Sequence, residues 1–64
     1  MAYERLQDRY FNTIGYTELM PDGWMKLLDK DYNTLGYYDP QLQRTMDKNY
    51  NTVGHGNILM TLLR

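Results

Sequence analysis

The stretch Asp29-Lys30-Asp31-Tyr32-Asn33-Thr34-Leu35-Gly36 is one of three copies of the same eight-residue element in the sequence. The other copies run from Asp8 to Gly15 and from Asp47 to Gly54, at spacings of 21 and 18 residues. Asp, Asn, Thr and Gly recur unchanged, and every other position except the third keeps its chemical type. Self-similarity at such a period indicates a repeated supersecondary unit.

Apolar residues ahead of and within each copy are spaced like one face of a helix. In the second unit they are Trp24, Leu27, Leu28, Tyr32 and Leu35, and the other units show similar steps of three and four. This spacing predicts amphipathic helices. The glycine at the end of each copy would then stop a helix, because glycine adopts the left-handed conformation without a Cβ penalty.

Helix start signals agree with this interpretation. Asp22 and Asn57 precede two of the predicted helices, and Asp39 followed by Pro40 precedes another. We therefore predict an all-α fold, with three or four short helices in a small helical array and an internal repeat of about 20 residues. The predicted helices span about 3–14, 23–35, 40–53 and 57–63, within one small helical-repeat domain of residues 1–64.

A second interpretation treats the end of each copy, with the residue after it, as a strand and a turn. Tyr, Thr, Val and Ile, which recur in these segments, all favour strands. The helix interpretation is preferred because each segment combines helical spacing with a capping signal upstream.

A chain of 64 residues without cysteine has few ways to stabilise a core. At this length folding buries only about 60% of the unfolded surface, and small natural domains usually add a disulfide, a metal or a partner. The lack of cysteine excludes disulfides and thiolate zinc sites. Because His55 is the only histidine, structural zinc would need carboxylate ligands, which is unusual. A hard metal ion or another protein chain remains.

The charge pattern argues against a nucleic-acid module. The net charge is −1 with both signs mixed along the chain, whereas such modules show a basic patch. The longest apolar run, Ile58 to Leu63, is far shorter than the about 20 residues of a membrane span. The segment Met1 to Arg5 lacks the apolar region of a signal peptide, so we expect a cytoplasmic site of synthesis. We expect neither nucleic acid nor membrane as a partner.

Calcium is the most specific ligand candidate, because oxygen-bearing side chains alternate in two copies as they do at the start of an EF-hand loop. These residues are Asp29, Asp31 and Asn33, and Asp47, Asn49 and Asn51. The match fails further on. Thr34 and Thr52 replace the glycine of the sixth position, and Pro40 and Ile58 replace the glutamate of the twelfth. We predict no metal and no cofactor, with a weak calcium-binding module as a third alternative.

The sequence offers little for catalysis. Cysteine and serine are absent, and Glu4 and Glu18 are the only glutamates. His55 lies between two glycines, where it is expected to be a loop residue. A chain this small also lacks room for a concave pocket that excludes water. We therefore predict a protein without enzymatic activity and assign no catalytic residues.

Aromatic residues and methionine are the compositional surplus of this chain, with seven Tyr, one Trp and five Met. These residue types are enriched at protein interfaces. They would also build the core of a small domain, where Tyr can be half-buried with its hydroxyl in water. We predict a non-enzymatic structural or adaptor subunit that binds protein partners within a larger assembly, such as a viral or phage particle, or associates with copies of itself. The alternative is a small regulatory inhibitor or binder of one cellular protein.

The predicted partner interface combines three kinds of residue. Trp24 would anchor either the core of the second predicted helix or a partner interface, since Trp leads among interface hot spots. Charged residues of the repeat would be presented in similar poses, and the apolar C-terminal segment needs cover, either from the other predicted helices or from a partner. The predicted interface residues are Trp24, Met25, Tyr37, Tyr38, Asp29, Lys30, Asp47, Lys48, Ile58 and Leu62.

Overall fold

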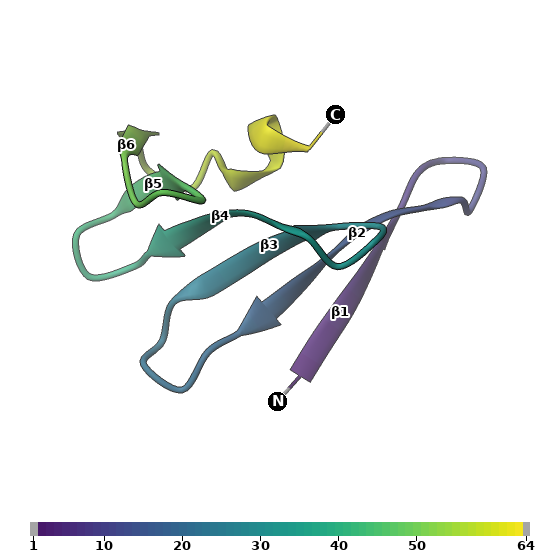
Figure 1. Ribbon diagram of the computed structural model, residues 1–64, viewed down its shortest axis with the longest axis horizontal. Helices are drawn as coiled ribbons and strands as arrows, with labels where there is room; N and C mark the ends of the chain where they lie inside the picture. Colours follow the sequence, from purple (N-terminus) through teal and green to yellow (C-terminus); the bar gives the residue numbers. More distant parts are fainter. Residues whose placement is uncertain (1, 64) are drawn as a thin grey trace.

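The computed structural model describes residues 2–63 as one antiparallel sheet of six strands in the order β1-β2-β3-β4-β5-β6 (Figure 1). Each strand pairs with its neighbour in sequence, so the sheet is a meander with β1 and β6 at its two edges. The strands are β1 (Ala2–Gln7), β2 (Thr13–Leu19), β3 (Met25–Asp29), β4 (Thr34–Asp39), β5 (Arg44–Asp47) and β6 (Thr52–His55), and a short 3-10 helix, η1 (Leu59–Leu62), follows them.

The prediction of an all-α helical array is therefore wrong, and the interpretation as strand and turn is correct. The predicted helices 3–14, 23–35 and 40–53 are each a hairpin, formed by β1 with β2, β3 with β4, and β5 with β6. Of the predicted helix 57–63, only the four residues of η1 are helical. The repeat is thus a hairpin loop and the start of the strand that follows it.

Each copy of the repeat begins with the same hydrogen-bonded loop, described here for the second copy. The carbonyl of Asp29 accepts the N–H of Tyr32 at 3.0 Å, and the N–H of Asp29 donates to the carbonyl of Asn33 at 2.9 Å. Tyr32 has a φ of 66°, in the left-handed region. A four-residue turn whose last residue is left-handed is the usual three-residue hairpin loop with a bulge.

The aspartate of the repeat fixes this loop from the inside. Oδ1 of Asp29 accepts the backbone N–H groups of Asp31 and Asn33, at 2.8 and 2.9 Å, and Oδ2 accepts the side-chain amide of Asn33 at 3.2 Å. The corresponding bonds recur around Asp8 and around Asp47. The invariant Asp and Asn of the repeat are therefore the two ends of one loop.

The left-handed residue of each loop is a large aromatic side chain. Phe11, Tyr32 and Tyr50 have φ values of 65°, 66° and 67°. Glycine or asparagine is the common choice at such a position, and a bulky residue there is rare. The aspartate bonds within the loop offset part of this conformational cost.

The two faces of the sheet are both covered, which explains the misleading helical spacing. Residues paired across strands share a face, so the register places Leu28 with Tyr16 on one face and Leu27 with Gly36 on the other. Both leucines are buried. Two consecutive buried residues break the alternation typical of a strand with one solvated face, and they imitate the steps of a helix.

The glycines that end the repeats are not helix caps. Gly15, Gly36 and Gly54 lie within β2, β4 and β6, and among residues 2–63 the glycines with positive φ are Gly23 and Gly56. The repeat glycines are needed for space. A Cβ on Gly15 would lie 2.6 Å from the carbonyl oxygen of Leu28 and 3.0 Å from Cδ1 of Leu63.

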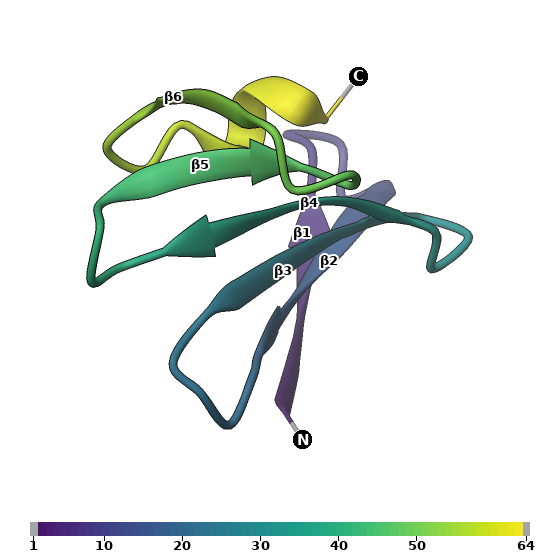
Figure 2. The ribbon, with the colours of Figure 1, turned by 60° about the vertical axis from the view of Figure 1, so that its left-hand side comes forward.

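The other two repeat glycines meet the same C-terminal segment. A Cβ on Gly36 would collide with Cδ1 of Leu62, and one on Gly54 would collide with Cδ1 of Ile58. The register puts the three glycines on one side of the sheet, which we call the glycine face. The chain turns back after β6 so that η1 contacts β4 and β5 (Figure 2).

A buried hydroxyl anchors this C-terminal segment to the glycine face. Thr45 is fully buried, its Oγ1 donates to the carbonyl of Gly56 at 2.8 Å, and it accepts the N–H of Ile58 at 3.1 Å. Leu59 is buried as well. The repeat glycines and Thr45 therefore determine where the apolar C-terminal residues pack.

Candidate functional site

Six aromatic side chains form two clusters on the side of the sheet opposite the glycine face. The first cluster is Tyr3, Tyr16 and Tyr32, and the second is Trp24, Tyr37 and Tyr50. We call the surface made by these six residues the aromatic face. Tyr3, Tyr32 and Tyr50 each leave more than half of their surface exposed, at 51%, 57% and 58%.

Two of the contacts on the aromatic face are parallel stacks built by the repeat. The ring of Tyr32 lies 4.4 Å from that of Tyr16, at an interplanar angle of 13°. The ring of Tyr50 lies 4.9 Å from that of Tyr37, at 11°. In both cases the left-handed residue of one copy covers the residue that follows the glycine of the preceding copy. The repeat therefore produces a regular series of stacked rings.

An ion pair lies between the two aromatic clusters. The register runs from Tyr3 to Glu18, from Glu18 to Lys26, and from Lys26 to Tyr37, which places these side chains in one row across the face. Nζ of Lys26 lies 3.7 Å from Oε1 of Glu18, with side chains 24% and 5% exposed. The mostly buried carboxylate thus has a cation as its neighbour.

The pKa values of two stacked tyrosines, Tyr32 and Tyr37, are raised. The hydrogen bond with Tyr16, together with desolvation, raises the pKa of Tyr32 above 10.0. The hydrogen bond with Tyr50, together with desolvation, raises the pKa of Tyr37 above the same value. The hydroxyls of Tyr50 and Tyr37 are 3.5 Å apart. At neutral pH these phenols are uncharged, and the aromatic face presents apolar rings with neutral polar tips.

The residues considered for calcium lie in the second and third repeat loops. There the carboxylates of Asp29 and Asp47 already accept backbone N–H groups and an asparagine amide. These bonds lower the pKa of each carboxyl below 3.8, with the backbone N–H of Asn33 or Asn51 as the largest cause. No group of three or more acidic, histidine or cysteine side chains suited to a metal occurs among residues 2–63. The pairs Asp29 with Asn33 and Asp47 with Asn51 therefore have a use within the loop itself.

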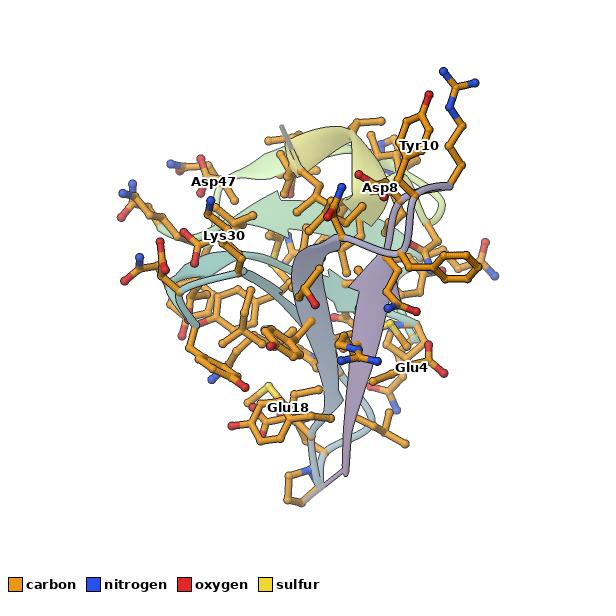
Figure 3. The ribbon with its side chains drawn as sticks, turned by 90° about the vertical axis from the view of Figure 1, so that its right-hand side faces the viewer. Glu4, Asp8, Tyr10, Glu18, Lys30 and Asp47 are labelled. Carbon is orange, nitrogen blue, oxygen red and sulfur yellow. The ribbon has the colours of Figure 1, made fainter. Side chains whose placement is uncertain are left out.

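An open depression separates the second and third loops, with Asp29, Asn33, Asp47 and Lys48 among its lining residues. Its two aspartates are committed to the loop hydrogen bonds described above. Lys30, Lys48 and Asp31 are exposed, so charges of both signs in the repeat face solvent. Figure 3 shows Lys30 and Asp47 toward the same end of the molecule as Asp8 and Tyr10.

His55, expected in a loop, is the last residue of β6 and is exposed. Gly56 then turns the chain with a φ of 74°, and its N–H donates to the carbonyl of Gln43. The structure places His55 at an edge of the sheet, in line with the residues that follow the glycines of the other two copies.

The residues predicted as a partner interface do not form one patch. Trp24 and Tyr37 lie on the aromatic face, where their ring centroids are 6.0 Å apart. Met25 and Tyr38 pair with each other on the glycine face. Ile58 and Leu62 pack against Gly54 and Gly36 and are used within the chain. Asp29, Lys30, Asp47 and Lys48 belong to the repeat loops.

Four tyrosines of the aromatic face were not predicted as interface residues: Tyr3, Tyr16, Tyr32 and Tyr50. The signal that would have found them is the repeat extended by one residue, because an aromatic residue follows the glycine in the first two copies and histidine in the third. In a strand this residue and the glycine point to opposite faces, so the repeat encodes a glycine face on which the C-terminal segment packs and an aromatic face.

No helix in the described part of the chain is long and apolar enough to cross a membrane. Comparison with known proteins gives no match to a family model, to a curated protein or to a solved structure. The geometry of the two faces is therefore the basis for assigning a function.

Proposed function

We propose that the protein is a non-enzymatic structural or adaptor subunit that binds a protein partner through its aromatic face, within a larger assembly. The observation that supports this most is the exposure of stacked rings: Tyr3, Tyr32 and Tyr50 keep more than half of their surface in solvent. Interfaces of protein complexes are enriched in Tyr, Trp and Met, and their hot spots favour Trp and Tyr. A cytoplasmic site of synthesis and a place in a viral or phage particle remain predictions.

The stacked geometry favours recognition because it holds the rings rigid before binding. A tyrosine packed against a second ring has little conformational freedom to lose when a partner covers it, which reduces the entropic cost of association. The Glu18–Lys26 pair between the clusters supplies a polar contact next to the apolar rings. Apolar rings with a polar element beside them match the composition of protein interfaces.

Hydroxyl-radical footprinting of the natural assembly and of the isolated chain tests this proposal. Oxidation of Trp24, Tyr32 and Tyr50, read by mass spectrometry, is expected to fall in the assembly. Tyr10 serves as the internal control, since it is 69% exposed in the first loop and lies outside both clusters. Equal oxidation of Tyr32 and Tyr50 in the two samples would contradict a role for the aromatic face.

A further inference from the structure

We propose that two copies of this chain join edge to edge, with β1 of one copy pairing with β6 of the next and the ring of Phe11 stacking on His55. The partner is thus a second copy of the chain, and the contact continues the antiparallel sheet. This inference deepens the proposed role in an assembly by naming one partner. It concerns the two sheet edges, and it leaves the aromatic face available to another protein.

The series of stacked rings within the chain is the basis of this proposal. Tyr32 covers Tyr16, and Tyr50 covers Tyr37, so each left-handed residue covers the ring that follows the glycine of the preceding copy. One residue of each kind has no such partner among residues 2–63. These are Phe11, the left-handed residue of the first copy, and His55, which follows the glycine of the third.

Phe11 has the same backbone conformation as the two left-handed residues that form stacks. Its loop has the same hydrogen bonds as the others, and its φ of 65° matches those of Tyr32 and Tyr50. Yet Phe11 is 79% exposed, the largest exposed fraction among the exposed large hydrophobic residues. A bulky left-handed residue without a packing contact carries a conformational cost. The loop does not require this cost, because the same turn would form with asparagine or glycine at position 11.

The register of the chain gives the register of the proposed contact. In the sheet, Gly15 pairs with Asp29 and Tyr16 with Leu28, and Gly36 with Asp47 and Tyr37 with Met46. The repeat glycine thus always faces the aspartate of the next copy. The same rule places Gly54 opposite Asp8 of the second copy, and His55 opposite Gln7 of the second copy. Phe11 of the second copy then lies over His55, as Tyr32 lies over Tyr16.

The position of the two strands determines the type of assembly. β1 and β6 are the opposite edges of the sheet, so the contact joins two different surfaces and leaves one free edge at each end. Such heterologous contacts form rings or open filaments. The contact is short because Gly56, with a φ of 74°, turns the chain away directly after His55. Association is therefore expected to depend on concentration.

Sedimentation velocity of the purified chain, at concentrations up to about 1 mM, measures this association. The mass is expected to rise above that of the 7.7 kDa monomer. Phe11→Asn and His55→Asn are each expected to weaken association by about tenfold, since each removes one ring of the stack. Asparagine is chosen at position 11 because it tolerates positive φ, and circular dichroism verifies that each variant retains its sheet.

Mixing the two variants separates this contact from a symmetric one. The Phe11→Asn chain keeps an intact β6 edge, and the His55→Asn chain keeps an intact β1 edge. An equimolar mixture is therefore expected to form one-to-one dimers more readily than either variant alone, without larger species. Tyr10→Asn is the matched control, because the third copy already has Asn49 at that position, and it is expected to associate like the wild type.

A monomer at every concentration would overturn the proposal, and so would a mixture that associates no better than its components. Association that survives both edge variants but is lost in Tyr50→Asn would place the contact on the aromatic face instead. Failure here is distinct from failure of the proposed function, because footprinting of Tyr32 and Tyr50 in the natural assembly reports on a different surface.

Discussion

Cδ1 of Leu62 lies in the space that a side chain on Gly36 would occupy. The carbonyl oxygen of Met46 limits the same space from the neighbouring strand. Glycine is therefore required at position 36 by packing, since its φ is not in the left-handed region. The same C-terminal segment meets Gly54 through side-chain atoms of Ile58 alone. A side chain at position 36 would thus meet a rigid backbone carbonyl, whereas one at position 54 would meet only a flexible side chain.

Gly36→Ala is expected to destabilise the protein by about 3 kcal/mol, because a backbone carbonyl cannot move aside without disturbing β5. Gly54→Ala is expected to cost about 1 kcal/mol, since the Ile58 side chain can rotate. Urea denaturation followed by circular dichroism measures both values. In a double-mutant cycle, the cost of Gly54→Ala should shrink when Ile58 is replaced by alanine. Equal costs at positions 36 and 54 would show that these contacts are not the reason for the glycines.

Acid should destabilise the repeat loops. Backbone N–H bonds lower the pKa of Asp8, Asp29 and Asp47 below the ordinary 3.8 in the folded chain. A lowered folded pKa means that the stabilising contribution is present above about pH 4 and is lost as the pH falls through the folded values. In thermal denaturation, the melting temperature is expected to decrease as the pH falls below about 4.

The triple variant Asp8→Asn, Asp29→Asn, Asp47→Asn is the control for the acid effect. Asparagine keeps an oxygen that can accept the loop N–H groups, but it does not titrate. As the pH falls below about 4, the variant should lose less stability than the wild type. The stability that the variant still loses comes from protonation of the other carboxylates. If both proteins lose the same stability over this range, the loop aspartates are not the cause.

The sequence predicted the existence and the limits of the repeat, but it misled on the secondary structure. In a hairpin loop of this kind, glycine or asparagine marks the left-handed position, whereas this chain has Phe11, Tyr32 and Tyr50 there. With aromatic residues at this position, the usual sequence signal of the turn is absent. The same residues add apolar positions at helical spacing. Asp29 and Asp47, predicted as weak calcium-ligand candidates and as partner contacts, are hydrogen-bond acceptors inside their loops.

The burial of both sheet faces also could not be read from local pattern. Leu27 and Leu28 are buried on opposite faces, with the C-terminal segment packed on one side and the stacked rings of Tyr16 and Tyr32 on the other. The cover on the glycine face comes from residues far away in sequence. The surplus of aromatic residues is visible in the sequence, and the role of Trp24 at an interface stays a prediction. The grouping of six rings on one face required the strand register.

The aromatic stacks should be visible in a tyrosine titration. Hydrogen bonds with Tyr16 and with Tyr50 raise the pKa of Tyr32 and Tyr37, respectively, above 10.0. Absorbance at high pH is expected to show two phenols that ionise later than the others. Because the folded pKa of these two phenols is raised, their contribution to the free energy of unfolding is present at lower pH. It is lost as the pH rises through the folded pKa values. Tyr16→Phe should return Tyr32 toward its ordinary pKa while Tyr37 stays raised.

The ion pair on the aromatic face gives the last prediction. Lys26→Met leaves the mostly buried carboxylate of Glu18 without its cation, and this is expected to destabilise the fold by about 1–3 kcal/mol. Replacing both partners, with Lys26→Met and Glu18→Leu, removes the buried charge together with its partner and should recover most of that stability. Urea denaturation of the three proteins measures the difference. A double variant no more stable than Lys26→Met alone would mean that the carboxylate is stabilised by groups other than Lys26.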